Sequence, residues 1–234
     1  MKGALQGIRI LDLSRVLAGP WATQLLGDYG ADVVKIERPG SGDDTRQWGP
    51  PWLGNESAYF LSTNRNKRSV TVDLGSSEGK AVLRELAAEA DVLVENFRVG
   101  TLQRLDLDPG DLMQSNPRLI ICSISAFGQS GSRAQEPGYD AMIQASAGLM
   151  SITGPEQGGP QKVGVAIADI MAGMYAANAV LAALQARERT GEGQRIDVPL
   201  YDSQVAWLAN QNMNYLVGGV VPGRMGTAHP NLVP

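Results

Sequence analysis

The chain has 234 residues, of which 43% are hydrophobic, and its formal net charge at pH 7 is −4. This composition is typical of a globular chain that can bury a sizeable core, and the acidic balance argues against non-specific binding to nucleic acid. With one cysteine, Cys122, and one histidine, His229, a disulfide framework, a cysteine metal cluster and a multi-histidine metal site are all excluded within this chain. We therefore expect no metal.

The N-terminus lacks the long apolar core of a secretion peptide, and we expect a cytoplasmic protein. Residues 170–186 carry no charge and raise the question of a membrane span. This run has only 17 residues, includes Asn178 and is rich in Ala and Gly. These features favour a buried helix of a soluble protein, and we expect no membrane segment.

The first forty residues have the pattern strand, helix, strand. Residues 8–13 and 32–37 predict strands, and Gly19-Pro20 begins a helix that Gly30 ends. Such a unit nearly always has parallel strands and a right-handed connection. The turn after the first strand lacks the GxGxxG fingerprint of dinucleotide-binding proteins, which weighs against a nucleotide-dependent oxidoreductase.

The alternation of strands and helices continues to about residue 217, after a loop-rich stretch over residues 38–66. Further strands are predicted at 69–74, 91–95, 118–123 and 193–198, with a short β-like run at 163–167. Further helices are predicted at 78–89, around Arg104, and at 109–115, 138–150, 169–189 and 199–217. This order predicts an α/β fold, Rossmann-like, with a mainly parallel sheet flanked by helices.

Basic and aromatic side chains follow several of the predicted strands. Arg15 comes after the first strand, Arg38 after the second, and Asn96-Phe97-Arg98 after the strand at 91–95. Because ligands of open α/β sheets bind beyond the carboxyl ends of the strands, these residues should meet at one rim. An anionic ligand with an apolar part, phosphate being the obvious anion, is the physical inference.

Asp169 stands alone at the start of the long helix of small residues. One interpretation is an N-cap, since Asp accepts hydrogen bonds from free backbone N–H groups and suits the helix dipole. The other is a nucleophile that the helix N-terminus holds ionised while apolar surroundings keep water away. Local pattern alone is compatible with both.

Six segments, in order and without large gaps, carry a more specific signal: DLSRVLAGPWATQLLGDYGADVVKIERPGSGDDTR, NRNKRSVTVDL, ADVLVENFRVGTLQRLDLD, NPRLIICSISAFGQSG, GYDAMIQASAGLMSITG and RTGEGQRIDVPLYDS. Together they resemble the class III CoA-transferases, the family of formyl-CoA transferase, carnitine CoA-transferase and the succinyl-CoA-dependent dicarboxylate transferases. The α-methylacyl-CoA racemases share this fold. The resemblance runs from about residue 5 to the last residue.

The resemblance implies a catalytic role for Asp169 in transferring CoA from an acyl-CoA to a carboxylic acid. In the family, an aspartate at this position attacks the thioester and forms a mixed anhydride, which the released CoA thiolate converts to an aspartyl-CoA thioester. The acceptor acid then takes over the CoA. A carboxylate suits this exchange because it is both nucleophile and leaving group. CoA and acyl-CoA are therefore expected as substrates.

The family's CoA contacts carry over by position, with Tyr139 beside the thioester. The residues implied are Val16, Ala18, Arg38, Val72, Asp73, Asn96, Phe97, Arg98, Arg104 and Tyr139. Tyr139 and Leu17 also discriminate within the family. Racemases carry a histidine at the position of Tyr139, so a two-base epimerisation lacks one partner here and a transferase is favoured. Formyl-CoA/oxalate enzymes carry a glutamine at Leu17, and the apolar residue favours a larger acid, such as glutarate with succinyl-CoA as donor.

The resemblance also implies a longer protein. Family members continue into a small domain with a glycine-rich loop over the active site, and they form interlocked homodimers. On this basis residues 1–217 are expected to be the CoA-binding Rossmann-like large domain, and residues 218–234 a linker toward a small domain absent from this chain. A racemase-like enzyme and an inactive CoA-binding or oligomerisation fragment stay open as alternatives.

Overall fold

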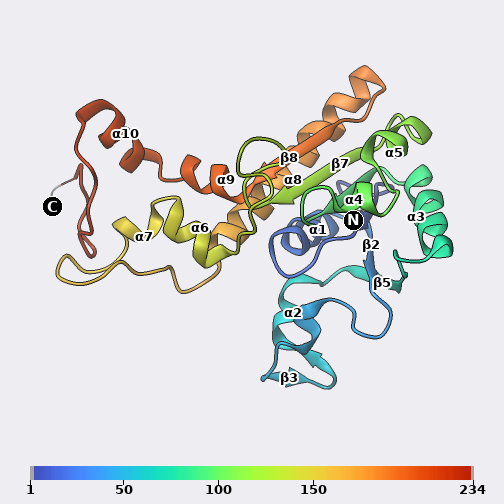
Figure 1. The fold of residues 1–234 in the computed structure, drawn as a ribbon, viewed down its shortest axis with the longest axis horizontal. Helices are drawn as coiled ribbons and strands as arrows, with labels where there is room; N and C mark the ends of the chain where they lie inside the picture. The colour runs from blue at the N-terminus through green and yellow to red at the C-terminus, as the bar shows by residue number, and fades with distance from the viewer. Residues whose placement is uncertain (1–2, 233–234) are drawn as a thin grey trace.

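Six parallel strands form the central sheet in the computed structural model of the chain, which describes residues 3–232 (Figure 1). The predicted α/β class with a mainly parallel sheet is confirmed. The strands are β1 (Arg9–Asp12), β2 (Asp32–Glu37), β5 (Lys67–Thr71), β6 (Val92–Glu95), β7 (Ile120–Ser125) and β8 (Arg195–Pro199).

The strand order across the sheet is β5-β2-β1-β6-β7-β8. Numbered along the chain, this is the order 3-2-1-4-5-6 of doubly wound nucleotide-binding sheets. The chain winds outward in one direction from β1 to β5 and in the other direction from β6 to β8. The winding therefore reverses between β1 and β6, and the carboxyl ends of these two neighbouring strands are the place where such sheets bind ligands.

Helices cover both faces of the sheet and bury two separate apolar layers. One layer joins Ile10, Val94 and Ile120 of the strands to small residues of α1 (Ala18–Asp28) and α8 (Ile167–Thr190). The layer on the opposite face joins Leu11, Leu93 and Ile121 to the helices α3 (Ser77–Glu89), α4 (Thr101–Arg104) and α5 (Pro109–Ser115). Successive strand residues alternate between the layers because side chains of a strand point to opposite faces.

The small residues of α8 serve close packing against α1. A Cβ atom added to Gly173 would lie 2.5 Å from the carbonyl oxygen of Ala18, so only glycine permits this approach of the two backbones. By length and composition α8 is also apolar enough to cross a membrane. One of its faces, including Ala172, Ala176 and Ala183, is buried in the core, whereas Tyr175 on another face is exposed. The buried face packs as predicted for a core helix, and the expectation of no membrane segment stays a prediction.

Several predicted elements differ in their boundaries or identity. Residues 163–167 form no strand, and α8 begins at Ile167. The predicted helix 138–150 is interrupted by Gly148, at φ 92°, and the helix 199–217 is also divided. The resulting pieces are α6 (Asp140–Ser146), α7 (Leu149–Ile152), α9 (Leu200–Ala206) and α10 (Ala209–Gly218). The loop-rich stretch 38–66 contains the short elements η1 (Asp44–Gln47), β3 (Trp52–Leu53), β4 (Glu56–Ser57) and α2 (Ala58–Thr63).

The C-terminal part of the chain lies away from the sheet, on the left of Figure 1. No residue of α10 is buried, and residues 219–232 form no helix or strand. The predicted large domain over residues 1–217 and linker from 218 onward stay predictions.

Candidate active site

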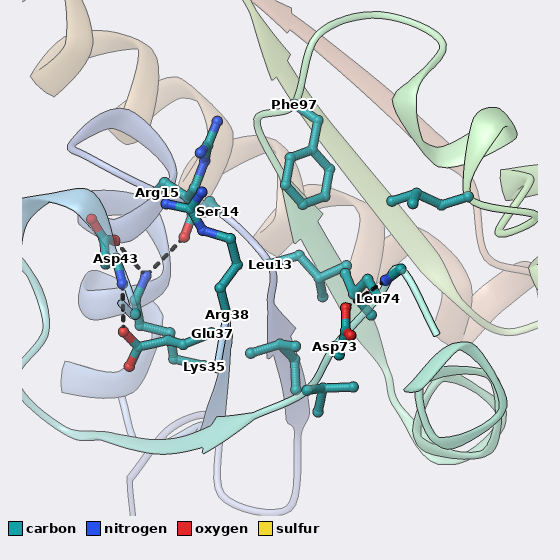
Figure 2. Close-up of a pocket in the computed structure, with 15 residues that line it drawn as sticks. Leu13, Ser14, Arg15, Lys35, Glu37, Arg38, Asp43, Asp73, Leu74 and Phe97 are labelled. Atoms are coloured by element: carbon teal, nitrogen blue, oxygen red, sulfur yellow. Dashed lines mark hydrogen bonds and ion pairs between the residues drawn. The ribbon is translucent and has the colours of Figure 1, made fainter. Parts of the chain in front are cut away.

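Two neighbouring pockets open at the carboxyl ends of the strands. The first, of about 210 Å³, has mainly apolar walls and is here named the edge pocket (Figure 2). The second, of about 190 Å³, contains Asp169 and is named the Asp169 pocket. Arg15 and Phe97 line both, so the two pockets adjoin at the switch point between β1 and β6. Together they offer a long ligand one site for an apolar, flat group and a second site beside a carboxylate.

Asp169 lies in the first turn of α8 and is half-buried in the wall of its pocket. It is not the N-cap, because the cap position is Ala166. The cap is supplied by another helix instead. Oδ1 of Asp140, at the start of α6, accepts hydrogen bonds from the backbone N–H of Ala168 at 2.7 Å and of Asp169 at 3.4 Å. The N-cap interpretation of Asp169 is therefore wrong, and its carboxylate does not cap α8.

The same Asp140 changes the acidity of Asp169. Burial, and next the negative charge of Asp140, raise the pKa of the Asp169 carboxyl from 3.8 to about 7. The expectation that the helix N-terminus keeps this group fully ionised is corrected by these two effects. Burial and then the charge of Asp169 also raise the pKa of the Tyr59 phenol. Asp169 thus changes its ionisation near neutral pH.

The segment leading into Asp169 is fixed by Gln144, a fully buried side chain of α6. Its Oε1 accepts from the backbone N–H of Val163 at 2.8 Å, and its Nε2 donates to Oδ2 of Asp140 at 2.7 Å. With a longer contact of 3.4 Å from Nε2 to the carbonyl oxygen of Val165, these bonds tie the segment before α8, which pairs with no strand, to α6. They also join Asp140 to the segment that places Asp169.

The loop after β1 is held from β6 by Asn96. The side-chain amide of Asn96 accepts from the backbone N–H of Arg15 at 2.8 Å and donates to the carbonyl oxygen of the same residue at 2.7 Å. Phe97 follows with its backbone N–H bonded to the Glu95 carboxyl at 2.8 Å. The two strand ends are consequently fixed to each other across the switch point.

Comparison with known proteins identifies this arrangement. The model of CoA-transferase family III matches residues 5–234, almost the whole chain. The chain belongs to CoA-transferase family III.

Individual members of the family are similar over nearly the full chain. A succinate–glutarate CoA-transferase of Agrobacterium fabrum is 52% identical over 100% of this chain and 60% of its own length. The human succinyl-CoA:glutarate CoA-transferase is 50% identical over 98% of this chain and 52% of its own length. The crystal structure of a CAIB/BAIF family protein from Brucella suis is 50% identical, with a TM-score of 0.96, over 100% of this chain and 63% of that one. The chain thus spans about half to two thirds of the length of these relatives.

Most residues that the family resemblance implied as CoA contacts come together in the two pockets. The edge pocket contains Arg38, Val72, Asp73 and Phe97, and the Asp169 pocket contains Val16, Ala18, Asn96, Phe97, Arg98, Tyr139 and Asp169. Arg104 is exposed on α4, bonded to Thr101, and lines neither of these pockets. Its role as a CoA contact stays a prediction that the arrangement of the chain does not support.

Sequence reasoning missed the charged groups beneath the groove. Lys35, in the middle of β2, and Asp43 form a fully buried ion pair with an N–O distance of 2.9 Å. A lysine inside an otherwise apolar strand was the available signal, because Lys is almost never buried without a partner. Among the described residues 3–232, no group of three or more His, Cys, Asp or Glu side chains is placed to hold a metal ion.

Proposed function

We propose that this chain supplies the CoA-binding groove and the attacking carboxylate of a CoA-transferase. The donor is an acyl-CoA, with succinyl-CoA as the best candidate, and the acceptor is a small dicarboxylic acid such as glutarate. The observation that carries the proposal is the position of Asp169. Its half-buried carboxylate does not cap α8, and it lies in one groove with the arginine and aromatic residues at the switch point.

The chemistry follows from the properties of a carboxylate in a sheltered pocket. An oxygen of ionised Asp169 attacks the thioester carbonyl carbon, the C–S bond breaks, and a mixed anhydride and CoA thiolate form. The thiolate attacks the Asp169 carbonyl of the anhydride, releasing the donor acid and leaving an aspartyl-CoA thioester. The acceptor carboxylate then attacks the aspartyl-CoA thioester and releases CoA thiolate. The thiolate attacks the acceptor carbonyl of the new anhydride, which releases Asp169 and gives the CoA thioester of the acceptor. Bonds are exchanged one for one, and no net proton is consumed.

The pocket's chemistry suits this sequence of steps. Attack needs the ionised carboxylate, and with a pKa of about 7 a substantial fraction of Asp169 is ionised at neutral pH. Burial removes hydrating water from the nucleophile, and exclusion of water protects an anhydride from hydrolysis. The apolar side chain of Leu17 in the same pocket suits the methylene groups of a longer dicarboxylic acid.

The ligand's two ends are assigned to the two pockets. The adenine end of CoA is proposed to occupy the edge pocket between Val72 and Phe97, whose apolar walls suit a flat base. The pantetheine arm then passes Arg15 into the Asp169 pocket, where Tyr139 is 74% exposed and available beside the thioester. A homodimer, a cytoplasmic location and a lid supplied by sequence outside this chain belong to the same proposal, by the resemblance to the longer relatives.

The test is exchange of labelled succinate into succinyl-CoA, together with CoA binding by titration calorimetry. Asp169→Asn is expected to lower exchange by at least about a thousandfold, since the nucleophile is lost, while CoA binding persists. Asp111→Asn is the matched control, because Asp111 also lies in the first turn of a helix but is exposed on α5 outside both pockets. Exchange that survives Asp169→Asn refutes the proposal. If the unchanged chain and Asp169→Asn both bind CoA but neither catalyses exchange, the result favours a CoA-binding fragment.

A further inference from the structure

The loop at residues 14–16 differs from the glycine-rich loops that bind phosphate at this place in nucleotide-binding folds. Such loops present free backbone N–H groups to the anion. Here each N–H of the loop already donates to a side chain. The acceptors for residues 14, 15 and 16 in turn are the Oδ1 atoms of Asp12 at 3.0 Å, Asn96 at 2.8 Å and Asp43 at 3.3 Å. These amides are therefore not available to an anionic ligand.

The loop is also fixed on its carbonyl side. Nζ of the buried Lys35 donates to the carbonyl oxygen of Ser14 at 2.7 Å, and Asn96 holds the carbonyl oxygen of Arg15. Val16 is held at φ 69°, a left-handed conformation that a β-branched residue rarely adopts. Such a conformation persists only where the surroundings determine it fully. Arg15 consequently leaves the loop from a rigid base, and anion recognition falls to its side chain rather than to the backbone.

Arg15 meets Arg38 across one acidic residue. Nη1 of Arg15 lies 3.3 Å from Oδ2 of Asp44, and Nη2 of Arg38 lies 2.6 Å from Oδ1 of the same carboxylate. This trio, named the arginine bridge, stands where the two pockets adjoin, with Arg38 in the edge pocket and Asp44 in the Asp169 pocket. In Figure 2 the side chain of Arg38 extends toward Arg15, with Phe97 across the pocket.

The arginine bridge has spare hydrogen-bonding capacity. Within residues 3–232 each of its guanidinium groups makes a single hydrogen bond, the one to Asp44, although a guanidinium carries five N–H donors. The side chains are 40–56% exposed. Ion pairs this exposed are weak, so a ligand with a stronger anion can exchange with Asp44.

Arg46, which lies near the arginine bridge, has a structural role that contrasts with it. Arg46 donates from Nε and Nη2 to the Glu37 carboxylate at 2.7 Å, and from Nη1 to Glu56 at 2.8 Å. Its guanidinium also stacks 3.7 Å from the ring centroid of Phe60. Arg46 is thus saturated by protein groups, whereas Arg15 and Arg38 share one carboxylate between them and face the groove.

The family resemblance already implies Arg38 as a CoA contact. We propose that Arg15 joins it in binding a phosphate of CoA where the pockets adjoin, and that Asp44 is a counter-ion which this phosphate displaces. The inference rests on the proposed function, because it takes CoA as the ligand of the groove. Asp44 neutralises the two arginines in the free chain. The site is therefore selective for ligands that carry phosphate, because only a strong anion binds the arginines more favourably than Asp44 does. Arg15 and Asp44 are thereby specificity-determining residues.

The test is titration calorimetry of the chain with CoA and with pantetheine, which has the same arm but no phosphate. Asp44→Asn removes the competing charge and is expected to lower the Kd for CoA about threefold to tenfold. Arg15→Gln is expected to raise that Kd at least about tenfold. Neither change should alter the affinity for pantetheine. Glu89→Gln is the control for net charge, because Glu89 pairs with Arg9 at an exposed site outside both pockets.

Asp44→Asn is expected to lower the Kd for CoA and Arg15→Gln to raise it, and this difference in direction distinguishes a displaced counter-ion from a residue that supports binding. If Asp44 merely orients the arginines for the ligand, Asp44→Asn weakens CoA binding, and the proposal is overturned. It is likewise overturned if the variant matches Glu89→Gln. In both cases the unchanged chain still binds CoA and the proposed function stands. A folded chain that binds no CoA defeats the proposed function itself, and the inference with it.

Discussion

Two charged clusters lie only a few residues apart at the switch point, and they are built in opposite ways. The buried ion cluster consists of Asp12, Lys35, Asp43 and Lys67, whose side chains are at most 2% exposed. The arginine bridge is 40–56% exposed. Burying charge is costly unless every group is paired, so the first cluster is suited to hold a backbone. The second can exchange its partner and is suited to recognition.

Lys67 is fully hydrogen-bonded within the buried cluster. Its three N–H donors reach Oδ2 of Asp12, the carbonyl oxygen of Pro20 and Oδ1 of Asn64, each at 2.9 Å. Burial nevertheless lowers the pKa of Lys67 to about 8, and the charge of Asp12 opposes that change. Asp169 is half-buried and belongs to neither cluster, because it makes no ion pair within residues 3–232.

The largest effect is expected from breaking the buried cluster. Lys35→Met leaves Asp43 buried without its cation and the carbonyl oxygen of Ser14 without its donor. The expected loss is about 3–5 kcal/mol of unfolding free energy, measured by urea denaturation. Arg38→Met, the matching change in the arginine bridge, should cost less than about 1 kcal/mol. Similar losses in the two variants would remove the distinction between the clusters.

A gain in stability is expected from removing the unpaired charge of Asp169. Its folded-state pKa of about 7 lies above its ordinary value of 3.8, so the folded state pays for ionisation. That penalty is fully present above pH 7 and disappears as the pH falls toward 3.8. Asp169→Asn should therefore stabilise the chain by up to about 4 kcal/mol at pH 8 and little at pH 4. A destabilised variant at pH 8 would mean that the carboxylate serves the fold.

A smaller effect is expected in the pH profile of exchange when the charge beside Asp169 is changed. Because the ionised carboxylate attacks, exchange should rise with pH through an apparent pKa near 7. Asp140→Asn removes a neighbouring charge while keeping an oxygen for the N–H of Ala168, and it should move the profile to lower pH. An unmoved profile in Asp140→Asn would show that Asp140 does not act on Asp169.

The smallest effect is expected from Asp44→Asn on stability. The ion pairs of the arginine bridge are exposed, so their loss should change the unfolding free energy by less than about 1 kcal/mol. Added salt should abolish even this difference, since it screens exposed pairs. The measurement is urea denaturation at low and high salt. A large, salt-resistant loss would place Asp44 with the buried cluster.

The sequence predicted the elements whose signals are local. The strand at 32–37 and the helix at 109–115 have the predicted boundaries, the first from its apolar run and the second from Pro109 at the first helical position. The rim of Arg15 and Arg38 followed from a simple rule about strand ends in parallel sheets.

The errors come from contacts between distant residues. The side chain that caps α8 is that of Asp140, 29 positions before Asp169, and Gln144 bonds to the segment that was predicted as a strand. The partners of Lys35 are likewise a carbonyl of another loop and an acidic residue after β2. Periodicity and propensity carry no information on such pairings, which only the folded chain brings together.

The most direct test of the account is intact-protein mass spectrometry of the chain mixed with succinyl-CoA, followed by peptide mapping. The account predicts a CoA-sized mass gain on the peptide containing Asp169, removed by hydroxylamine and absent in Asp169→Asn. A chain that binds CoA by titration yet gains no mass, or gains it on another side chain, would contradict Asp169 as the attacking carboxylate.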